Sequence, residues 1–324
     1  MRLTKYFPIL ATGAAIFLST VAPAMAQGQE AAPIPELNFR LDENFFRYPA
    51  NFVLGRAVGV AVAPNGNIVT LNRGYHPVME FTSDGKFVRS WGEGSTMFAG
   101  AHVVRFDLQG NLWYVDAADN IIFRFDKEGR TVGTLGHNPQ PWTFLTHAIE
   151  RAAPNRDGFY QETDIGWSKD GSIFVSDGYG NSRIAKFDKD GKFVKAWGER
   201  GNKPGEFNTP HSLVVDNNDV VYVADRANSR IQAFDSEGNL KAVWNLPTAP
   251  WALCLTNSPD QAMFVGSVGR IYKMDLSGKI LGAFGRSGRF PGTLDAIHQI
   301  ACPDEKTLFV AQTFLERFDK WVAQ

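Results

Sequence analysis

A repeated phrase, in which an aspartate follows an aromatic or apolar residue and precedes a glycine by three positions, runs through this 324-residue sequence. The copies lie at 79–85, 123–129, 185–191, 232–238, 272–278 and, truncated, at 316–320. With Thr82, Asp126, Asp188, Asp235, Asp275 and Asp319 taken as equivalent, the intervals are 44, 62, 47, 40 and 44 residues. A sixfold repeat with this period predicts a repeat architecture, because each copy is one supersecondary unit that must bury a face against its neighbours.

Within one copy the sequence predicts four short strands. Residues 211–216 form an alternating segment, 220–225 a second apolar strand, 230–235 an amphipathic strand and 240–244 a last strand, and turn residues separate them. Four strands at this period are typical of a propeller blade. A solenoid is the alternative, but no capping repeat is visible, which favours closure into a ring. The expected fold is therefore all-β, a six-bladed β-propeller over residues 41–324.

Two parts of the repeat are irregular. The last copy has little sequence after Phe318 and Asp319 to build a fourth strand, and the stretch from Glu36 to Leu41 can supply it. The 62-residue interval contains an insertion at about 137–163, between the second and third blades. Long loops in compact domains are more often functional than idle, so this insertion is a candidate lid.

The amino terminus has the pattern of an export signal. Arg2 and Lys5 precede an apolar stretch at 7–21, which ends in the small-x-small sequence 24–26. We expect a signal peptide over residues 1–26, followed by a flexible leader over 27–40. A retained membrane anchor is the weaker alternative, because polar residues and a proline interrupt a short apolar run. The mature protein is then expected to be secreted or periplasmic and free of the membrane.

The charge balance and the cysteine content exclude several kinds of partner and site. The 33 basic and 34 acidic residues leave no basic excess, so no nucleic-acid partner is expected. The two cysteines, Cys254 and Cys302, exclude a cysteine zinc site and allow at most one disulfide. Export would permit their oxidation, but spacing does not tell whether they pair. We expect a monomer.

Histidines occupy one structural position in alternate blades. The equivalent positions at the start of the six innermost strands are Val58, His102, Thr163, His211, Trp251 and His298. Alternate blades of a sixfold ring lie about 120° apart, so the three imidazoles should converge on the axis. Three nitrogen ligands with one open position are the ligand set of a catalytic zinc. The alternative is that each histidine is an ordinary polar residue lining a wet channel. The other three histidines, His76, His137 and His147, lack this registration.

The copies resemble NHL repeats, and in detail they resemble the peptidyl-α-hydroxyglycine α-amidating lyase family over about residues 50–324. The most specific segments are 175–184, 195–199, 204–207, 210–213 and 223–232. The resemblance implies that His102, His211 and His298 bind zinc. It also implies an active-site arginine at Arg73, in an Arg-Gly pair, and an active-site tyrosine at Tyr179, in an Asp-Gly-Tyr phrase.

This resemblance predicts a lyase that cleaves the N–C bond of a peptidyl-α-hydroxyglycine-like substrate to an amide and glyoxylate. Arg73 would bind the substrate carboxylate, and Tyr179 would take the hydroxyl proton with help from a nearby cation. Calcium is doubtful. The family holds it with an aspartate and two carbonyls matching Val60 and Val104, whereas Gln299 here offers no charge at the aspartate position.

Two other functions remain open from the sequence. One is a non-catalytic NHL propeller that binds a peptide or protein partner on its face, because fold does not fix function. The other is a metal-dependent hydrolase or lactonase propeller. Those use carboxylate-rich calcium sites, which the aligned channel positions lack.

Overall fold

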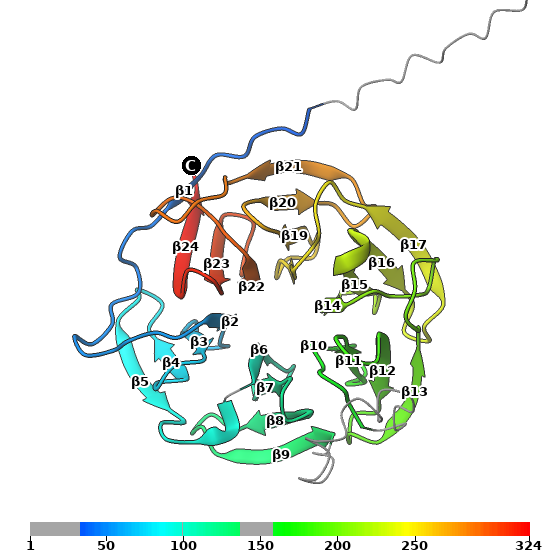
Figure 1. Cartoon of the computed structure of the whole chain (residues 1–324), viewed down its shortest axis with the longest axis horizontal. Coiled ribbons are helices and arrows are strands. Elements are labelled where there is room, and N and C mark those ends of the chain that lie inside the picture. The colour runs from blue at the N-terminus through cyan, green and yellow to red at the C-terminus, as the bar shows by residue number, and fades with distance from the viewer. Residues whose placement is uncertain (1–32, 99, 137–157) are drawn as a thin grey trace, which may run out of the picture. The chain divides into compact units, whose positions relative to one another are not determined.

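Six four-stranded antiparallel sheets are arranged in a ring around a common centre (Figure 1). The computed structural model describes residues 33–98, 100–136 and 158–324 of the chain. No α-helix occurs among these residues, and the 3-10 turns η1 (Thr96–Phe98) and η3 (Arg226–Asn228) lie between strands. The prediction of an all-β, six-bladed propeller is confirmed.

Each blade runs from an innermost to an outermost strand. Blade 1 contains β2 (Ala57–Val62), β3 (Ile68–Asn72), β4 (Val78–Phe81) and β5 (Phe87–Trp91). Blade 2 contains β6 (Ala101–Phe106), β7 (Leu112–Asp116), β8 (Ile121–Phe125) and β9 (Thr131–Gly136). Blade 3 contains β10 (Asp164–Trp167), β11 (Ile173–Asp177), β12 (Arg183–Phe187) and β13 (Phe193–Trp197). Blade 4 contains β14 (Pro210–Val215), β15 (Val221–Asp225), β16 (Arg230–Phe234) and β17 (Leu240–Asn245). Blade 5 contains β18 (Ala252–Leu255), β19 (Met263–Gly266), β20 (Ile271–Met274) and β21 (Ile280–Phe284). Blade 6 contains β22 (Ile297–Ala301), β23 (Thr307–Gln312), β24 (Arg317–Ala323) and β1 (Phe39–Leu41).

The hydrophobic core lies between the blades. Six clusters of buried apolar side chains fill the six interfaces between neighbouring blades, one cluster each. Central strands therefore bury both faces: all five residues of β15 are buried, whereas the outermost strand β17 is partly exposed. Because both faces are covered, the near-continuous apolar runs in the second strand of each blade are explained by packing rather than by alternation.

The repeated aspartate forms the turn between the third and fourth strands. In four blades its Oδ1 accepts the backbone N–H groups two and four residues on; for Asp235 these are Glu237 (2.9 Å) and Asn239 (2.9 Å). The glycine three residues after it has a positive φ, 82° at Gly238, which disfavours other residues. The phrase thus repeats because each blade needs the same turn. Asp319 differs, since it lies within β24 and no turn follows it.

The amino-terminal strand closes the ring. β1 pairs antiparallel with β24, with Phe39 opposite Ala323 and Leu41 opposite Trp321. This confirms that the stretch from Glu36 to Leu41 supplies the missing strand. Residues 39 and 40 therefore belong to blade 6 and not to a flexible leader. The Phe39 ring stacks on Phe284 of blade 5 at 4.4 Å between centroids, which anchors the strand.

Cys254 and Cys302 form a disulfide, with their Cα atoms 6.0 Å apart. Cys254 lies in β18 and Cys302 follows β22, so the bond joins blades 5 and 6. The expected signal peptide and residues 27–32 of the leader lie outside the described residues, as does most of the candidate lid (137–157). Within the described part of the chain, no helix has the length and apolar character that a membrane span requires.

Candidate active site

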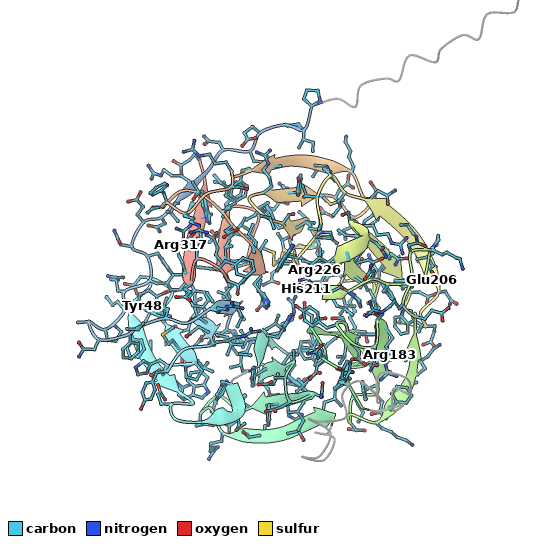
Figure 2. The ribbon with its side chains drawn as sticks, viewed as in Figure 1. Tyr48, Arg183, Glu206, His211, Arg226 and Arg317 are labelled. Atoms are coloured by element: carbon cyan, nitrogen blue, oxygen red, sulfur yellow. A yellow bond between two sulfur atoms is a disulfide. The ribbon has the colours of Figure 1, made fainter. Side chains whose placement is uncertain are left out.

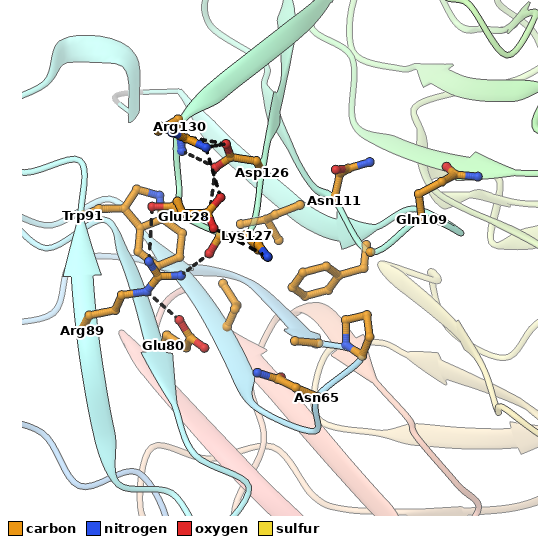
Figure 3. Close-up of a pocket in the computed structure, with 16 residues that line it drawn as sticks. Asn65, Glu80, Arg89, Trp91, Gln109, Asn111, Asp126, Lys127, Glu128 and Arg130 are labelled. Atoms are coloured by element: carbon orange, nitrogen blue, oxygen red, sulfur yellow. Dashed lines mark hydrogen bonds and ion pairs between the residues drawn. The ribbon is translucent and has the colours of Figure 1, made fainter.

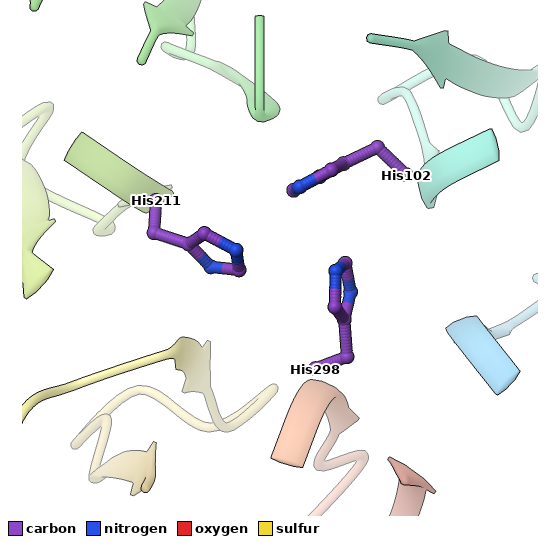
Figure 4. A group of neighbouring side chains, drawn as sticks. All are labelled: His102, His211 and His298. Carbon is purple, nitrogen blue, oxygen red and sulfur yellow. The ribbon is translucent and has the colours of Figure 1, made fainter. Parts of the chain in front are cut away.

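The three histidines of blades 2, 4 and 6 converge at the centre of the ring (Figure 4). His102, His211 and His298 are buried, with exposures of 1–5%, and one nitrogen of each lies within 4.8 Å of the others. Each lies at a register shift near the start of its innermost strand. A β-bulge redirects a side chain, here toward the axis instead of into the layer between blades.

Each imidazole is oriented by a backbone carbonyl of the next blade. Nδ1 of His102 lies 2.6 Å from the Thr163 oxygen, and Nδ1 of His211 lies 2.7 Å from the Trp251 oxygen. The third histidine repeats this arrangement, with Nδ1 2.8 Å from the oxygen of Val58. A carbonyl only accepts, so each Nδ1 carries the proton and donates. Each neutral ring therefore has its lone pair on Nε2.

Burial and neighbouring charges keep the imidazoles neutral. Burial is the main cause that lowers the pKa of all three, to about 3 for His298 and well below the usual value for His102 and His211. The positive charge of Arg73 lowers the pKa of His102 and His298 further, and that of Arg226 acts on His211 and His298. Neutral imidazole is the form that binds a metal.

This donor set fits zinc. Three buried nitrogen lone pairs face one another, and each ring is fixed by a hydrogen bond from its other nitrogen, as in known zinc sites. Among the described residues, no other group of three histidine, cysteine or acidic side chains has a comparable arrangement. His76 instead lies 2.8 Å from Glu93 through Nδ1 and stacks on Phe52. His137 and His147 lie outside the described residues.

Tyr179 reaches the same centre from the loop between β11 and β12. Its hydroxyl oxygen lies 2.9 Å from Nε2 of His211 and 3.2 Å from Nε2 of His102. The flanking glycines allow this position, because a Cβ on Gly178 would lie 2.1 Å from the Pro210 oxygen and one on Gly180 would overlap the Tyr160 ring. The hydroxyl is therefore placed where it can exchange a proton with a group held at the histidines.

Arg73 approaches from the loop between β3 and β4. Its Nε donates to the carbonyl of Ala101, 2.8 Å away in blade 2, next to His102. Asn72 fixes the loop by accepting the N–H groups of Gly55 (3.1 Å) and Gly74 (2.8 Å) through Oδ1. Because Nε is already bonded to protein, the terminal nitrogens remain to bind an anion beside the histidines.

A second arginine at this centre, Arg226, was missed by the sequence reasoning. Its Cζ lies 5.4 Å from the centroid of the Tyr179 ring and 4.3 Å from that of Trp251. Figure 2 shows it with His211 near the middle of the ring. The sequence did contain a signal for Arg226. Asp225-Arg226 in blade 4 and Asp177-Gly178-Tyr179 in blade 3 lie in corresponding loops, because an Asn-Ser-Arg sequence follows in both blades.

Gln299 occupies the channel next to the histidines. Its Oε1 accepts the N–H groups of Val60 (3.1 Å) and Val104 (3.2 Å), and its Nε2 donates to the carbonyl of Val104 (2.6 Å). Two donors facing one oxygen and one acceptor facing the nitrogen fix the orientation of the amide. An N–H group directed at the Val104 carbonyl takes up an oxygen that a calcium ion would need. These residues do not fit calcium.

Two hollows lie away from the histidines. A pocket of about 630 Å³ lies between blades 1 and 2, where Arg89 covers the Trp91 ring and pairs with Glu80 (Figure 3). It is lined by turns at the opposite ends of the strands from the histidines. Another pocket, of about 530 Å³, includes Gln299 and the disulfide at the other end of the channel. Neither contains a sequence-predicted catalytic residue.

Several known proteins are similar in sequence. The rat peptidylglycine alpha-amidating monooxygenase is 34% identical over 238 residues, or 63% of this chain and 23% of the rat protein. A probable peptidyl-alpha-hydroxyglycine alpha-amidating lyase of Caenorhabditis elegans is 30% identical over 250 residues, or 68% of this chain and 63% of that one. Human NHL repeat-containing protein 3 is 30% identical over 217 residues, covering 64% and 60%. The chain thus spans about a quarter of the rat relative.

The fold is shared more widely. Residues 161–277 match a family described as a 6-bladed beta-propeller. A virginiamycin B lyase from Staphylococcus aureus superposes with a TM-score of 0.61 at 15% identity, covering 88% of this chain and 100% of that one. A gluconolactonase from Xanthomonas campestris gives 0.60 at 14% identity, covering 92% and 99%. These two likenesses show the fold alone. The chain is a six-bladed β-propeller whose relatives include peptidyl-α-hydroxyglycine α-amidating lyases and NHL repeat proteins.

Proposed function

We propose that this protein is an exported zinc lyase that cleaves the N–C bond of peptidyl-α-hydroxyglycine-like substrates, giving an amide and glyoxylate. The observation that carries the proposal is the set of three inward-facing Nε2 atoms of His102, His211 and His298, with the Tyr179 hydroxyl on two of them. Relatives named as lyases of this class support the reaction.

The chain's own residues account for the remaining chemistry. Zinc held by the three histidines would supply a Lewis acid that stabilises negative charge on a substrate oxygen. Arg73 is placed to bind the substrate carboxylate through its terminal nitrogens. Tyr179 is placed to take the hydroxyl proton as the carbon–oxygen bond becomes the aldehyde of glyoxylate. The electron pair of the breaking C–N bond passes to nitrogen, which gains that proton as the amide forms. Arg226 lies against the Tyr179 ring, with its Cζ 5.4 Å from the ring centroid, and brings a second positive charge to this centre.

We propose no calcium, because the amide of Gln299 fills the position and hydrogen-bonds the carbonyl that an ion would use. The Cys254–Cys302 disulfide supports a secreted or periplasmic location, where such bonds persist. A small peptide-like substrate fits the lyase relatives, and a monomeric state stays a prediction.

Metal analysis of the purified mature protein tests the site. We expect about one zinc per chain, lost in His211→Ala while the fold remains, because blade packing rather than the metal holds the ring together. His76→Ala is the matched control, since it removes a histidine that faces Glu93 and should keep the zinc. Unchanged zinc in His211→Ala refutes the site.

Glyoxylate release from an α-hydroxyglycine substrate such as α-hydroxyhippurate tests the reaction separately. Zinc without glyoxylate means that the reaction class is wrong although the metal site is right. That outcome favours the non-catalytic propeller as the function, a role that the similarity to NHL repeat-containing protein 3 leaves open.

A further inference from the structure

Two aromatic side chains stand beside the histidines at one side of the ring. Trp251 directly precedes β18 of blade 5, and its ring centroid lies 5.3 Å from that of His211. Phe314 lies in the turn between β23 and β24 of blade 6, and its ring meets the Trp251 ring at 6.3 Å and 78°. Phe314 is 58% exposed. A large apolar ring is thus held in water next to the proposed reaction centre.

Two arginines accompany this aromatic pair. Cζ of Arg226 lies 4.3 Å from the Trp251 ring centroid, and Cζ of Arg56 lies 5.8 Å from that of Phe314. Within the described residues neither arginine has an ion pair. Each ring of the pair therefore has a cationic group against it, and Phe314 remains open to solvent.

The position of the pair matters for a bound substrate. Arg73 is anchored on Ala101 in blade 2, whereas Trp251 lies in blade 5, on the opposite side of the sixfold ring. If the carboxylate binds Arg73 and the reacting carbon lies at the histidines, the acyl part of the substrate extends toward blades 5 and 6. This step rests on the proposed function.

We propose that Trp251 and Phe314 form a subsite for an aromatic side chain on the residue immediately before the hydroxyglycine. Two rings set edge to face offer a third ring both a face and an edge, the arrangements that aromatic groups prefer. The positive charges of Arg226 and Arg56 beside the two rings also disfavour a cationic side chain at the substrate residue that binds there. The subsite defines substrate class: peptides with an aromatic penultimate residue.

The test compares two substrates that differ by one phenyl group, N-acetyl-Phe-α-hydroxyglycine and N-acetyl-Ala-α-hydroxyglycine. The wild type should show a higher kcat/KM for the Phe substrate. Phe314→Ala should lower that preference about tenfold by lowering kcat/KM for the Phe substrate, whereas the Ala substrate, which has no ring to contact Phe314, is the reference. Phe314→Tyr should retain the preference. Phe290→Ala is the matched control, because Phe290 is 78% exposed, and the phenylalanine ring that meets Trp251 is that of Phe314.

A binding measurement separates this subsite from the reaction. Calorimetric titration of the zinc-loaded protein with N-acetyl-Phe-Gly and N-acetyl-Ala-Gly, which lack the hydroxyl and cannot react, should show the same preference and its loss in Phe314→Ala. A wild type that releases no glyoxylate but keeps this binding preference refutes the proposed reaction and supports the subsite. Equal preference in wild type, Phe314→Ala and Trp251→Ala overturns the subsite.

Discussion

Removing the Cys254–Cys302 disulfide should destabilise the protein by about 4 kcal/mol. The bond links residues 48 apart in sequence, and cross-linking a loop of that length lowers the entropy of the unfolded chain by an amount worth about 4 kcal/mol at 25 °C. The enclosed loop contains most of blade 5, so the bond restrains a large unit. With an unfolding entropy of roughly 2 cal/mol/K per residue, the melting temperature should fall by roughly 7 °C.

Urea unfolding followed by tryptophan fluorescence and far-UV circular dichroism measures this difference. We compare oxidised protein, protein treated with a phosphine reductant, and the Cys254→Ala/Cys302→Ala variant, which is the control because the reductant should not change its midpoint. Zinc content should stay constant, since both cysteines line the pocket at the end of the channel away from the histidines. Equal midpoints for oxidised and reduced wild type would show that the loop-entropy reasoning does not apply to this ring.

Four further predictions concern the site and the closing strand. Arg73→Ala should raise KM about 10- to 100-fold with little change in kcat, because a charged hydrogen bond to the carboxylate is made in the ground and transition states alike. Tyr179→Phe should lower kcat about 10²- to 10⁴-fold, because proton transfer takes place in the transition state. If steady-state kinetics show a lower kcat for Arg73→Ala and a higher KM for Tyr179→Phe, the roles assigned to the two residues are exchanged. EGTA should leave the wild-type melting temperature unchanged at fixed zinc, whereas Gln299→Asp should gain calcium-dependent stabilisation; a drop of several degrees in the wild type would contradict this. Phe39→Ala should cost about 2 kcal/mol in urea unfolding, because it removes a half-buried ring stacked on blade 5, and a loss below 0.5 kcal/mol would mean that β1 does not secure closure.

Local features made the fold predictable from the sequence. The aspartate turn depends on residues within five positions of each other, as at Asp235, so each blade carries its own copy of the signal. The truncated last copy predicted that β1 would come from the amino terminus. Alignment of the copies also placed His102, His211 and His298 at one level of the ring, and the structure brings them together. Their role as zinc ligands stays a prediction.

Contacts between distant residues were not predictable in the same way. The disulfide depends on how β18 and β22 lie side by side, which spacing does not encode. Arg226 lies in a loop that is one residue shorter than the loop of Tyr179 in blade 3, so alignment of the copies did not give it a chemical role. The hydrogen bonds of Gln299 join it to Val60 and Val104, residues 239 and 195 positions away, and only the closed ring brings these groups into contact.

Alternate blades contribute different groups to the centre of the ring. This explains why the imidazoles could be predicted from the sequence and the carbonyls that orient them could not. Blades 2, 4 and 6 supply imidazoles, which require one residue type. At the equivalent positions, blades 1, 3 and 5 supply the backbone carbonyls of Val58, Thr163 and Trp251, which any residue provides. Their side chains are consequently free for other tasks. The hydroxyl of Thr163 donates to the carbonyl of Pro210, across the interface between blades 3 and 4, and the ring of Trp251 faces Phe314 at the proposed subsite. Substitution of the Trp251 side chain should therefore change substrate preference without loss of zinc, because its carbonyl continues to orient His211.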